Sequence, residues 1–201
     1  PMLINIVVTT YYPDSELGRM RKAAAQNVMK SWDALVYEGH LQLIMEDDSV
    51  RKGVGASLNR GFKRAFQTSP LAMYMVDDWM LNEYYDLDPW VKLIEEHEDI
   101  GMIRLGPPHP GLTGKIVHDD NRWYMRLDRH DYVYGMRPAL YHKRFFDAYG
   151  WFKEGVSAVE CEQDYNVRFC DSRGPDIIYA LPTPWEHIRT LDLGELQPCQ
   201  N

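Results

Sequence analysis

The sequence predicts an α/β protein with a mostly parallel central sheet and helices on both faces. Four short apolar runs, at residues 3–8, 41–45, 71–76 and 100–106, have the continuous hydrophobic pattern of strands covered on both sides. The stretches between them repeat apolar residues every three or four positions, as amphipathic helices do. This alternation of strand and helix is typical of a parallel sheet.

The first strand and helix are predicted from residues 3–32. The run "LINIVV" is rich in β-branched residues and predicts a buried strand, which the turn "TTYYPD" ends. A helix is predicted at 16–32, because an apolar face recurs there through Leu17, Met20, Ala24, Val28 and Trp32.

The same pattern continues through the second, third and fourth strands. After "LQLIM", the segment "KGVGASLNRGFKRAFQTSP" opens with glycines and carries helically spaced apolar residues: Val54, Leu58, Phe62 and Phe66. Pro70 ends that helix before the strand "LAMYMV". Asp88 is predicted as the N-cap and Pro89 as the first position of a helix through about residue 98. The strand "IGMIRLG" follows.

The second half predicts a small antiparallel part. Residues 107–114, "PPHPGLTG", predict a loop, and "RWYMRL" at 122–127 alternates apolar and polar residues as an antiparallel strand does. We expect a strand at 133–141, helices at 142–150 and 159–174, and a last strand at 176–182. Gly150 and Gly174 are expected to end the two helices.

Composition limits the possible classes of function. The 201 residues suit one domain, and a hydrophobic content of 45% supports a sizeable core. The formal net charge of -8 argues against broad nucleic-acid binding, which needs a basic surface. The three cysteines form no CxxC pair, no apolar run is long enough to span a membrane, and the opening run is too short for a signal peptide. We therefore expect a cytoplasmic protein without a membrane span.

Acidic residues follow two of the predicted strands directly. The second strand ends at Asp47 and Asp48, the third ends at Asp77 and Asp78, and the first ends in threonines. The carboxyl ends of parallel strands meet at one edge of a sheet, which is where ligands bind in such proteins. Adjacent buried carboxylates repel one another unless a cation compensates, and Mg²⁺ or Mn²⁺ bridging to a diphosphate would do so.

Each of these features also has a purely structural explanation. Asp77 and Asp78 fit the capping of a turn, and "EDDS" is common in solvated turns. The segment "GVGASLNRG" is neither a dinucleotide fingerprint nor a phosphate loop, and it fits a helix start with a glycine at a close-packing position. His187 fits a structural histidine, and acids at the start of a helix, such as Glu162 and Asp164, favour the helix dipole.

The order of the segments resembles the family 2 glycosyltransferases of the GT-A fold. In that family a first strand leads into a Thr-rich turn, as in "IVVTTYY", and the second strand ends in an acid-acid-x-Ser signature, as in "EDDS". A segment similar to "GVGASLNRG" follows, with its Asn and Gly at Asn59 and Gly61. The third strand then ends in a metal-binding acidic motif, which "VDDW" matches.

The resemblance extends through the second half. "PALYHKRFFDAYGWFKEG" is similar to the acceptor-side strand and helix of the family, and "EQDYNVRFCDSRG" to its acid-containing helix. The chain departs from the family pattern at two positions. Val76 stands where the family usually has the first acid of its metal motif, and Gln163 stands before the position of the catalytic base.

The resemblance implies a single GT-A, or Rossmann-like, domain over residues 1–201, with a nucleotide-sugar-binding half at 1–106 and an acceptor-side half at 107–201. It implies a metal-dependent, inverting transfer of a sugar from a nucleotide diphosphate sugar, with UDP favoured, to an acceptor hydroxyl. Asp78 and His187 are expected to bind Mn²⁺ or Mg²⁺. Asp164 is the expected base. The residues expected to contact the nucleotide sugar are Thr9, Tyr11, Asp48, Asn59 and Asp77.

Two other functions stay open at this stage. A nucleotidyltransferase of similar fold would attack a phosphate, but it usually carries a Gly-rich phosphate loop, which "TTYYPDSELG" lacks. A non-catalytic nucleotide-sugar-binding module is compatible with Val76 in the place of an acid. The acceptor is a glycan or a modified nucleobase in DNA among other classes, and the sequence predicts no oligomeric state.

Overall fold

The computed structural model describes residues 2–48, 52–108, 110–129 and 134–188. The longer strands are β1 (Leu3–Thr10), β3 (His40–Asp47), β4 (Leu71–Val76), β7 (Ile100–Arg104), β8 (Gly114–Asp119), β9 (Arg122–Leu127), β10 (Ala139–His142) and β11 (Asp176–Leu181). The α-helices are α1 (Glu16–Ser31), α2 (Val54–Ala65), α3 (Asp88–Glu96), α4 (Lys143–Tyr149) and α5 (Ala158–Asp171). A short 3-10 helix, η1 (Trp32–Ala34), follows α1, and the short strands are β2 (Leu35–Val36), β5 (Trp79–Leu81), β6 (Tyr85–Asp86) and β12 (Trp185–His187).

The main sheet has eight strands in the order β3-β1-β4-β10-β7-β11-β9-β8. Strands β3, β1 and β4 are parallel neighbours, and β7 is parallel to β11. Strand β10 lies antiparallel between β4 and β7, and β9 and β8 extend the sheet as an antiparallel hairpin beside β11. The predicted mixed α/β class is therefore confirmed, and the second half of the chain contributes strands to the middle of the sheet.

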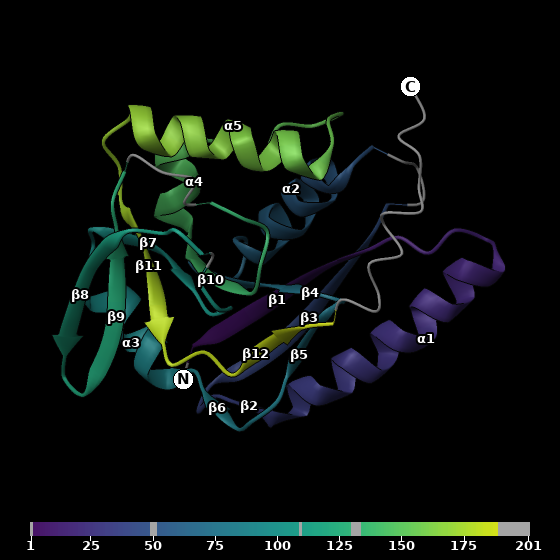
Figure 1. Cartoon of the computed structure of the whole chain (residues 1–201), viewed down its shortest axis with the longest axis horizontal. Helices are drawn as coiled ribbons and strands as arrows, with labels where there is room; N and C mark the ends of the chain where they lie inside the picture. The colour runs from purple at the N-terminus through teal and green to yellow at the C-terminus, as the bar shows by residue number, and fades with distance from the viewer. Residues whose placement is uncertain (1, 49–51, 109, 130–133, 189–201) are drawn as a thin grey trace.

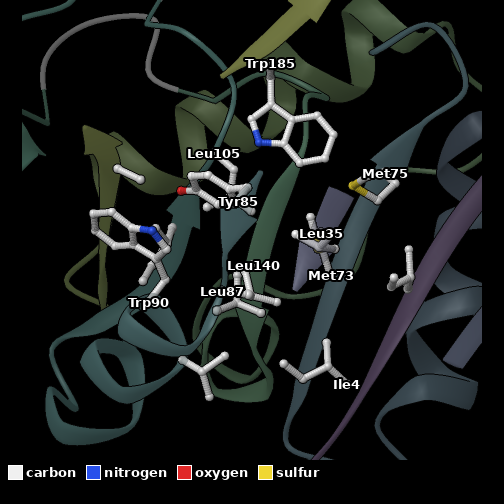
Figure 2. Packing of buried hydrophobic residues seen from close by; sticks show 14 of the residues in the cluster. Ile4, Leu35, Met73, Met75, Tyr85, Leu87, Trp90, Leu105, Leu140 and Trp185 are labelled. Carbon is white, nitrogen blue, oxygen red and sulfur yellow. The ribbon is translucent and has the colours of Figure 1, made fainter. Parts of the chain in front are cut away.

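Helices cover both faces of this sheet (Figure 1). Helices α1 and α3 pack on one face, where the core includes Ile4, Met73 and Leu140 of the sheet and Trp90 of α3 (Figure 2). Helices α2, α4 and α5 pack on the other face around a second apolar cluster. Among the described residues, no helix combines the length and apolar character needed to cross a membrane.

Several predicted boundaries need correction. Asp88 is the first residue of α3 and Leu87 is its N-cap, so Pro89 is the second residue of the helix and not the first. The strand expected at 133–141 is confined to Ala139–His142, and Pro138, which has no N–H to give to a sheet, directly precedes it. The described part of the remaining stretch is not in a strand, and residue 133 lies outside the described residues.

Other elements were not predicted. Strand β8 begins at Gly114, the last residue of the expected loop, and carries mostly polar or exposed side chains. The short strands β2, β5, β6 and β12 have two or three residues each, which is too few for a periodic pattern. Helix α5 starts one residue before the predicted bound, because Ser157 and Glu160 form a capping box there, and it ends at Asp171 and not at the predicted Gly174.

Phe62 of α2 is at the centre of the second apolar cluster. It is fully buried, and its ring centroid lies 5.0 Å from that of Tyr141, 4.8 Å from that of Phe146 and 6.2 Å from that of Phe152. These partners come from β10, α4 and the segment after α4. Phe62 thus joins the first half of the chain to the second.

We expect Phe62→Ala to destabilise the protein by about 3–5 kcal/mol, because it leaves a cavity among close-packed rings. Urea denaturation measures the change. The control is Tyr84→Ala, since Tyr84 is 69% exposed and its removal is expected to change stability by less than about 0.5 kcal/mol. Equal effects of the two substitutions would show that Phe62 is not at the centre of the core.

His142 caps helix α4 and is expected to make folding pH-dependent. Its Nδ1 accepts a hydrogen bond from the backbone N–H of Arg144 at 3.1 Å. Burial, together with the positive charge of Arg144, lowers the pKa of His142 from 6.5 to about 4. Between about pH 4 and pH 6.5, His142 is therefore protonated in the unfolded chain and neutral in the folded chain. This contribution to stability is fully present above about pH 6.5 and is lost as the pH falls to about 4.

We expect His142→Asn to reduce the loss of stability on acidification, because Asn keeps an N-cap acceptor and does not titrate. The difference between the two proteins should be on the order of 1 kcal/mol, since solvent screens a half-buried ring. Denaturant unfolding at several pH values from about 6.5 to about 4 measures it. Identical pH profiles for the variant and the wild type would contradict this assignment.

Candidate active site

The carboxyl ends of β1, β3 and β4 meet at one edge of the sheet. Thr10 is in register with Asp47, and Thr9 is in register with Val76, the last residue of β4. The acids that follow β3 and β4 therefore lie on either side of the threonines of β1, as the parallel arrangement predicted. This edge carries most of the polar residues that the sequence singled out.

Two residues that follow β1 approach Asp77. It is only 3% exposed, and its Oδ2 accepts a hydrogen bond from the hydroxyl of Tyr12 at 2.9 Å. The guanidinium of Arg21 lies 3.8 Å from its Oδ1. Burial, reinforced by the charge of Asp77, raises the pKa of Tyr12, so this hydroxyl stays protonated as a donor. Asp77 is therefore a buried carboxylate whose charge is compensated by the protein.

Asp78 has a different environment. Its Oδ2 lies 3.3 Å from Nε2 of His187, whereas its Oδ1 is buried and has no hydrogen-bond partner among the described residues. Burial raises the pKa of Asp78, and the nearby His187 opposes that shift. A buried carboxylate oxygen without a partner is costly, so an additional cation or donor is expected there.

Strand β12 brings His187 to Asp78. It pairs antiparallel with β5 so that His187 is in register with Trp79, and the rings of these two residues stack with centroids 5.1 Å apart. The backbone N–H of Ile188 donates to the carbonyl oxygen of Asp78 at 2.8 Å. These contacts fix a histidine beside a carboxylate from which it is separated by 109 positions in the chain.

The pair formed by Asp78 and His187 fits part of a site for a divalent ion. Among the described residues, no group of three or more His, Cys, Asp or Glu side chains is arranged to hold a metal. Mg²⁺, however, usually binds through only one or two carboxylates together with substrate phosphates, and Mn²⁺ accepts similar oxygen ligands. The partnerless oxygen of Asp78 is the feature that favours an ion at this position.

A cavity of about 340 Å³ opens beside Asp77. It brings together three predicted nucleotide-binding residues, Thr9, Tyr11 and Asp48, and it includes Asp77 itself. The other residues that line it are Thr10, Arg21, Val54, Ser57, Tyr74, Val76, Met136, Ala158 and Glu162. The cavity is thus formed by the ends of the strands and by the starts of α2 and α5.

Asp48 lines this cavity and also shapes it. Its carboxylate accepts hydrogen bonds from the backbone N–H groups of Lys52 and Gly53, at 2.9 and 3.1 Å. Gly53 is the N-cap of α2 and has a φ of 84°, which favours glycine. Asp48 therefore fixes the backbone of Lys52 and Gly53 just before α2, and any contact with a nucleotide would use the remaining acceptor capacity of its carboxylate.

Asn59 lies elsewhere. It is 2% exposed, and its side chain binds both backbone groups of Phe152, donating to the carbonyl oxygen at 3.0 Å and accepting from the N–H at 2.9 Å. It does not line the cavity. A Cβ on the nearby Gly55 would meet the carbonyl oxygen of Lys153 at 2.2 Å, so this glycine allows α2 to approach the same segment, as the structural explanation of "GVGASLNRG" proposed.

Helix α5 presents its two candidate acids differently. Asp164 forms an ion pair with Arg168 one turn further along the helix, and it does not line the cavity. Glu162 does line the cavity, and its Oε1 accepts a hydrogen bond from the backbone N–H of Met136 at 2.5 Å. The two residues are two positions apart, so they lie on opposite sides of a helix with 3.6 residues per turn.

The position of Glu162 around the axis of α5 could have identified it from the sequence as a residue that faces the cavity. The buried residues of α5 include Cys161, Tyr165 and Phe169, which face the sheet. Glu162 lies three residues before Tyr165 and seven before Phe169, so it is closer to the middle of that side than Asp164 is.

A second cavity, of about 630 Å³, is lined by Trp79, the residue that follows the acidic pair in the chain. Trp79, Trp185 and His187 line it together with Arg137, whose guanidinium lies 5.5 Å from the centre of the Trp79 ring. The remaining residues of its lining are Pro107, Pro108, Pro110, Glu186 and Ile188. Asp77 thus borders one cavity and Trp79 borders the other, with Asp78 between them in the chain.

No protein-family model matches this chain, and no curated protein matches its sequence. Solved structures do resemble it. One is the crystal structure of S. aureus TarS, residues 1–349, in complex with UDP-GlcNAc, with a TM-score of 0.58, 13% identity, and coverage of 94% of this chain and 61% of that chain. The chain therefore spans less than two thirds of the TarS fragment.

A second resemblance is to a mutant of Drosophila β-1,4-galactosyltransferase 7 in complex with manganese, UDP-Gal and xylobiose, with a TM-score of 0.50, 12% identity, and coverage of 98% of this chain and 77% of that chain. A weaker likeness, with a TM-score of 0.41 and 12% identity, is to 4-diphosphocytidyl-2C-methyl-D-erythritol synthase from Anaerococcus prevotii, over 98% of this chain and 99% of that one. Likeness at these identities shows the fold alone, and the chain therefore has a mixed α/β fold like that of the GT-A glycosyltransferases.

Proposed function

We propose that this chain is a metal-dependent, inverting glycosyltransferase that moves a sugar from a nucleotide diphosphate sugar to an acceptor hydroxyl. The observation that carries the proposal is the partnerless carboxylate oxygen of Asp78 beside His187. Its chain neighbours line two cavities: Asp77 borders the one that holds the predicted nucleotide-binding residues, and Trp79 borders the one lined by tryptophans. Ligand sites at the carboxyl edge of an open α/β sheet are the general rule.

The cavity beside β1 suits the nucleotide part of a donor. Thr9 and Tyr11 line it from β1 and the turn that follows, and Asp48 lines it from the turn after β3. Asp77, which is compensated by Tyr12, borders the same space. Asn59 would act indirectly, by fixing the segment around Phe152. The TarS and galactosyltransferase structures named above contain UDP-sugars, which supports UDP over other nucleotides.

Asp78 and His187 would hold Mn²⁺ or Mg²⁺, and manganese in the galactosyltransferase complex supports the first. When bound, such an ion stabilises the negative charge that develops on a leaving diphosphate without the need for a proton. The stacking of His187 on Trp79 and the bond from Ile188 to Asp78 keep both side chains in place before any ligand arrives. The protein's contribution is this preorganisation.

The acceptor hydroxyl has to lose its proton to a carboxylate within hydrogen-bond reach. The resemblance assigns this role to Asp164, but the position of Glu162 in the cavity favours Glu162. An inverting transfer is a single displacement, so one base suffices and no nucleophilic side chain is needed. The reacting hydroxyl would lie near Glu162, and the cavity around Trp79 offers room for the rest of the acceptor, because apolar ring faces suit a sugar or another ring.

A donor screen tests the proposal against its alternatives. Hydrolysis of UDP-, GDP- and dTDP-sugars with Mn²⁺ is measured beside calorimetric binding of the same compounds. Slow release of free sugar from at least one donor supports a glycosyltransferase. Binding without any turnover, with or without added glycans or modified DNA as acceptors, indicates the non-catalytic module, and release of pyrophosphate from a nucleoside triphosphate indicates a nucleotidyltransferase.

We expect Asp78→Asn to lower Mn²⁺-dependent donor hydrolysis by about 100-fold, as the loss of a group that stabilises transition-state charge does. The free protein should be no less stable than the wild type, because Asn keeps the size of Asp78 and removes the repulsion between two adjacent carboxylates. Thermal melting without ligand measures the stability of the free proteins. Melting with saturating Mn²⁺ and UDP should show stabilisation of the wild type but not of Asp78→Asn.

The matched control for this variant is Asp171→Ala, because Asp171 is exposed at the end of α5 and lines neither cavity. It should behave as the wild type does in both measurements. An Asp78→Asn protein that is still stabilised by Mn²⁺ and UDP to the full extent would remove the basis for the metal site.

We expect Glu162→Gln to keep donor binding and to lower transfer by about 100- to 10,000-fold, the range that a general base contributes. Asp164→Asn should have a smaller effect on transfer, because its partner Arg168 points it away from the cavity lining. Initial rates with a saturating donor, and calorimetric titration of UDP, separate catalysis from binding. The reverse order of the two effects would restore the base role to Asp164.

A further inference from the structure

Arg21 of α1 is a cation within the cavity beside Asp77. Its side chain is 29% exposed, and it is among the residues that line the cavity. Among the described lining residues it is the one positively charged side chain, whereas Asp48, Asp77 and Glu162 contribute negative charge. A nucleoside diphosphate that entered this space would add further negative charge next to these acids.

The contact between Arg21 and Asp77 is long. Nη2 of Arg21 lies 3.8 Å from Oδ1 of Asp77, which is beyond hydrogen-bond distance, whereas Tyr12 donates to the same carboxylate at 2.9 Å. Tyr12 alone can therefore hold Asp77 in its orientation. Arg21 contributes a nearby charge, and this contact does not occupy the N–H donors of its guanidinium.

A guanidinium in this position matches the chemistry of a diphosphate. It carries five N–H donors in a planar fork that pairs with phosphate oxygens, and its charge does not depend on pH in the physiological range. Asp77 keeps Arg21 at the cavity wall by electrostatic attraction, at a distance that still leaves the guanidinium free to approach a second anion.

We infer that Arg21 binds the diphosphate of the nucleotide ligand and thereby offsets the acidic lining of the cavity. This inference rests on the proposed function, because it assumes that a nucleoside diphosphate occupies the space. It assigns to α1 a phosphate-binding residue that neither the acidic motif nor the sequence resemblance indicates. The nucleoside part of the ligand is held by other residues, so Arg21 should affect the phosphates alone.

Calorimetric titration of Arg21→Gln with UDP and with uridine tests this inference. If GDP or dTDP binds the wild type more tightly than UDP does, that nucleoside diphosphate and its nucleoside are used in place of UDP and uridine. We expect the affinity for UDP to fall by about tenfold or more, in line with the loss of charged hydrogen bonds. The affinity for uridine should be unchanged, and Arg21→Lys should show a smaller loss because it keeps the charge without the fork.

The matched control is Arg19→Gln, since Arg19 is an exposed arginine on the same helix and does not line the cavity. It should bind both ligands as the wild type does, and all three variants should melt near the wild-type temperature. Equal losses of UDP and uridine affinity in Arg21→Gln, or no loss of either, would overturn the inference. A wild-type protein that binds no nucleoside diphosphate more tightly than its nucleoside would overturn the proposed function and this inference with it.

Discussion

The pair of adjacent carboxylates at the end of β4, of which Asp77 is buried and Asp78 is partly buried, is the constraint on which the rest of the candidate site depends. Like charges at this separation repel, and removal from water makes each more costly. The chain compensates the two acids from different directions. Tyr12 and Arg21, which follow β1, face Asp77, and His187, which ends β12, faces Asp78. Segments far apart in the sequence therefore have to meet at this edge of the sheet.

The topology of the sheet makes that meeting possible. Strand β10 lies between β4 and β7, so the second half of the chain is built into the sheet next to the strand that carries the acids. The chain then continues through β11 to β12, which pairs with β5 directly after Asp78. Phe62 and Asn59 tie α2 to the same second half through rings and backbone groups. The two halves contribute to one sheet, and the candidate site uses residues from both.

The sequence predicted the parts of the fold whose side chains repeat over a long enough stretch. Strands β1 and β4 and the helix containing Phe62 have patterns that burial on both sheet faces imposes, and these are confirmed. Strands β5 and β12 have three residues each, so their pairing depends on tertiary contacts that no local pattern records. Strand β8 is an exposed edge with polar side chains, and it lacks the apolar alternation that would identify it.

The candidate site was predictable to the extent that it follows from strand ends. The position of Thr9, Asp48 and Asp77 around one cavity follows from the parallel order of β1, β3 and β4. The hydrogen-bond partners of these side chains were not predictable, because they are backbone groups that the fold brings into place. Asp48 accepts from the N–H of Gly53 before α2, and Asn59 accepts from the N–H of Phe152. The order of acids in the motif favoured Asp164, whereas the phase of α5 is what places Glu162 at the cavity.

The presence of Val76, in place of an acid, helps to explain why Asp77 and Asp78 have such different environments. An acid at this position would be a third negative charge beside Asp77 and Asp78, and its burial would require a further cation. Val76 instead packs against the apolar clusters on both sides of the sheet and lines the cavity with a neutral surface. With one charge fewer, Tyr12 and Arg21 compensate Asp77, and His187 faces Asp78. The Oδ1 atom of Asp78, which is buried and has no hydrogen-bond partner among the described residues, is then the position in this pair that an external cation would stabilise most.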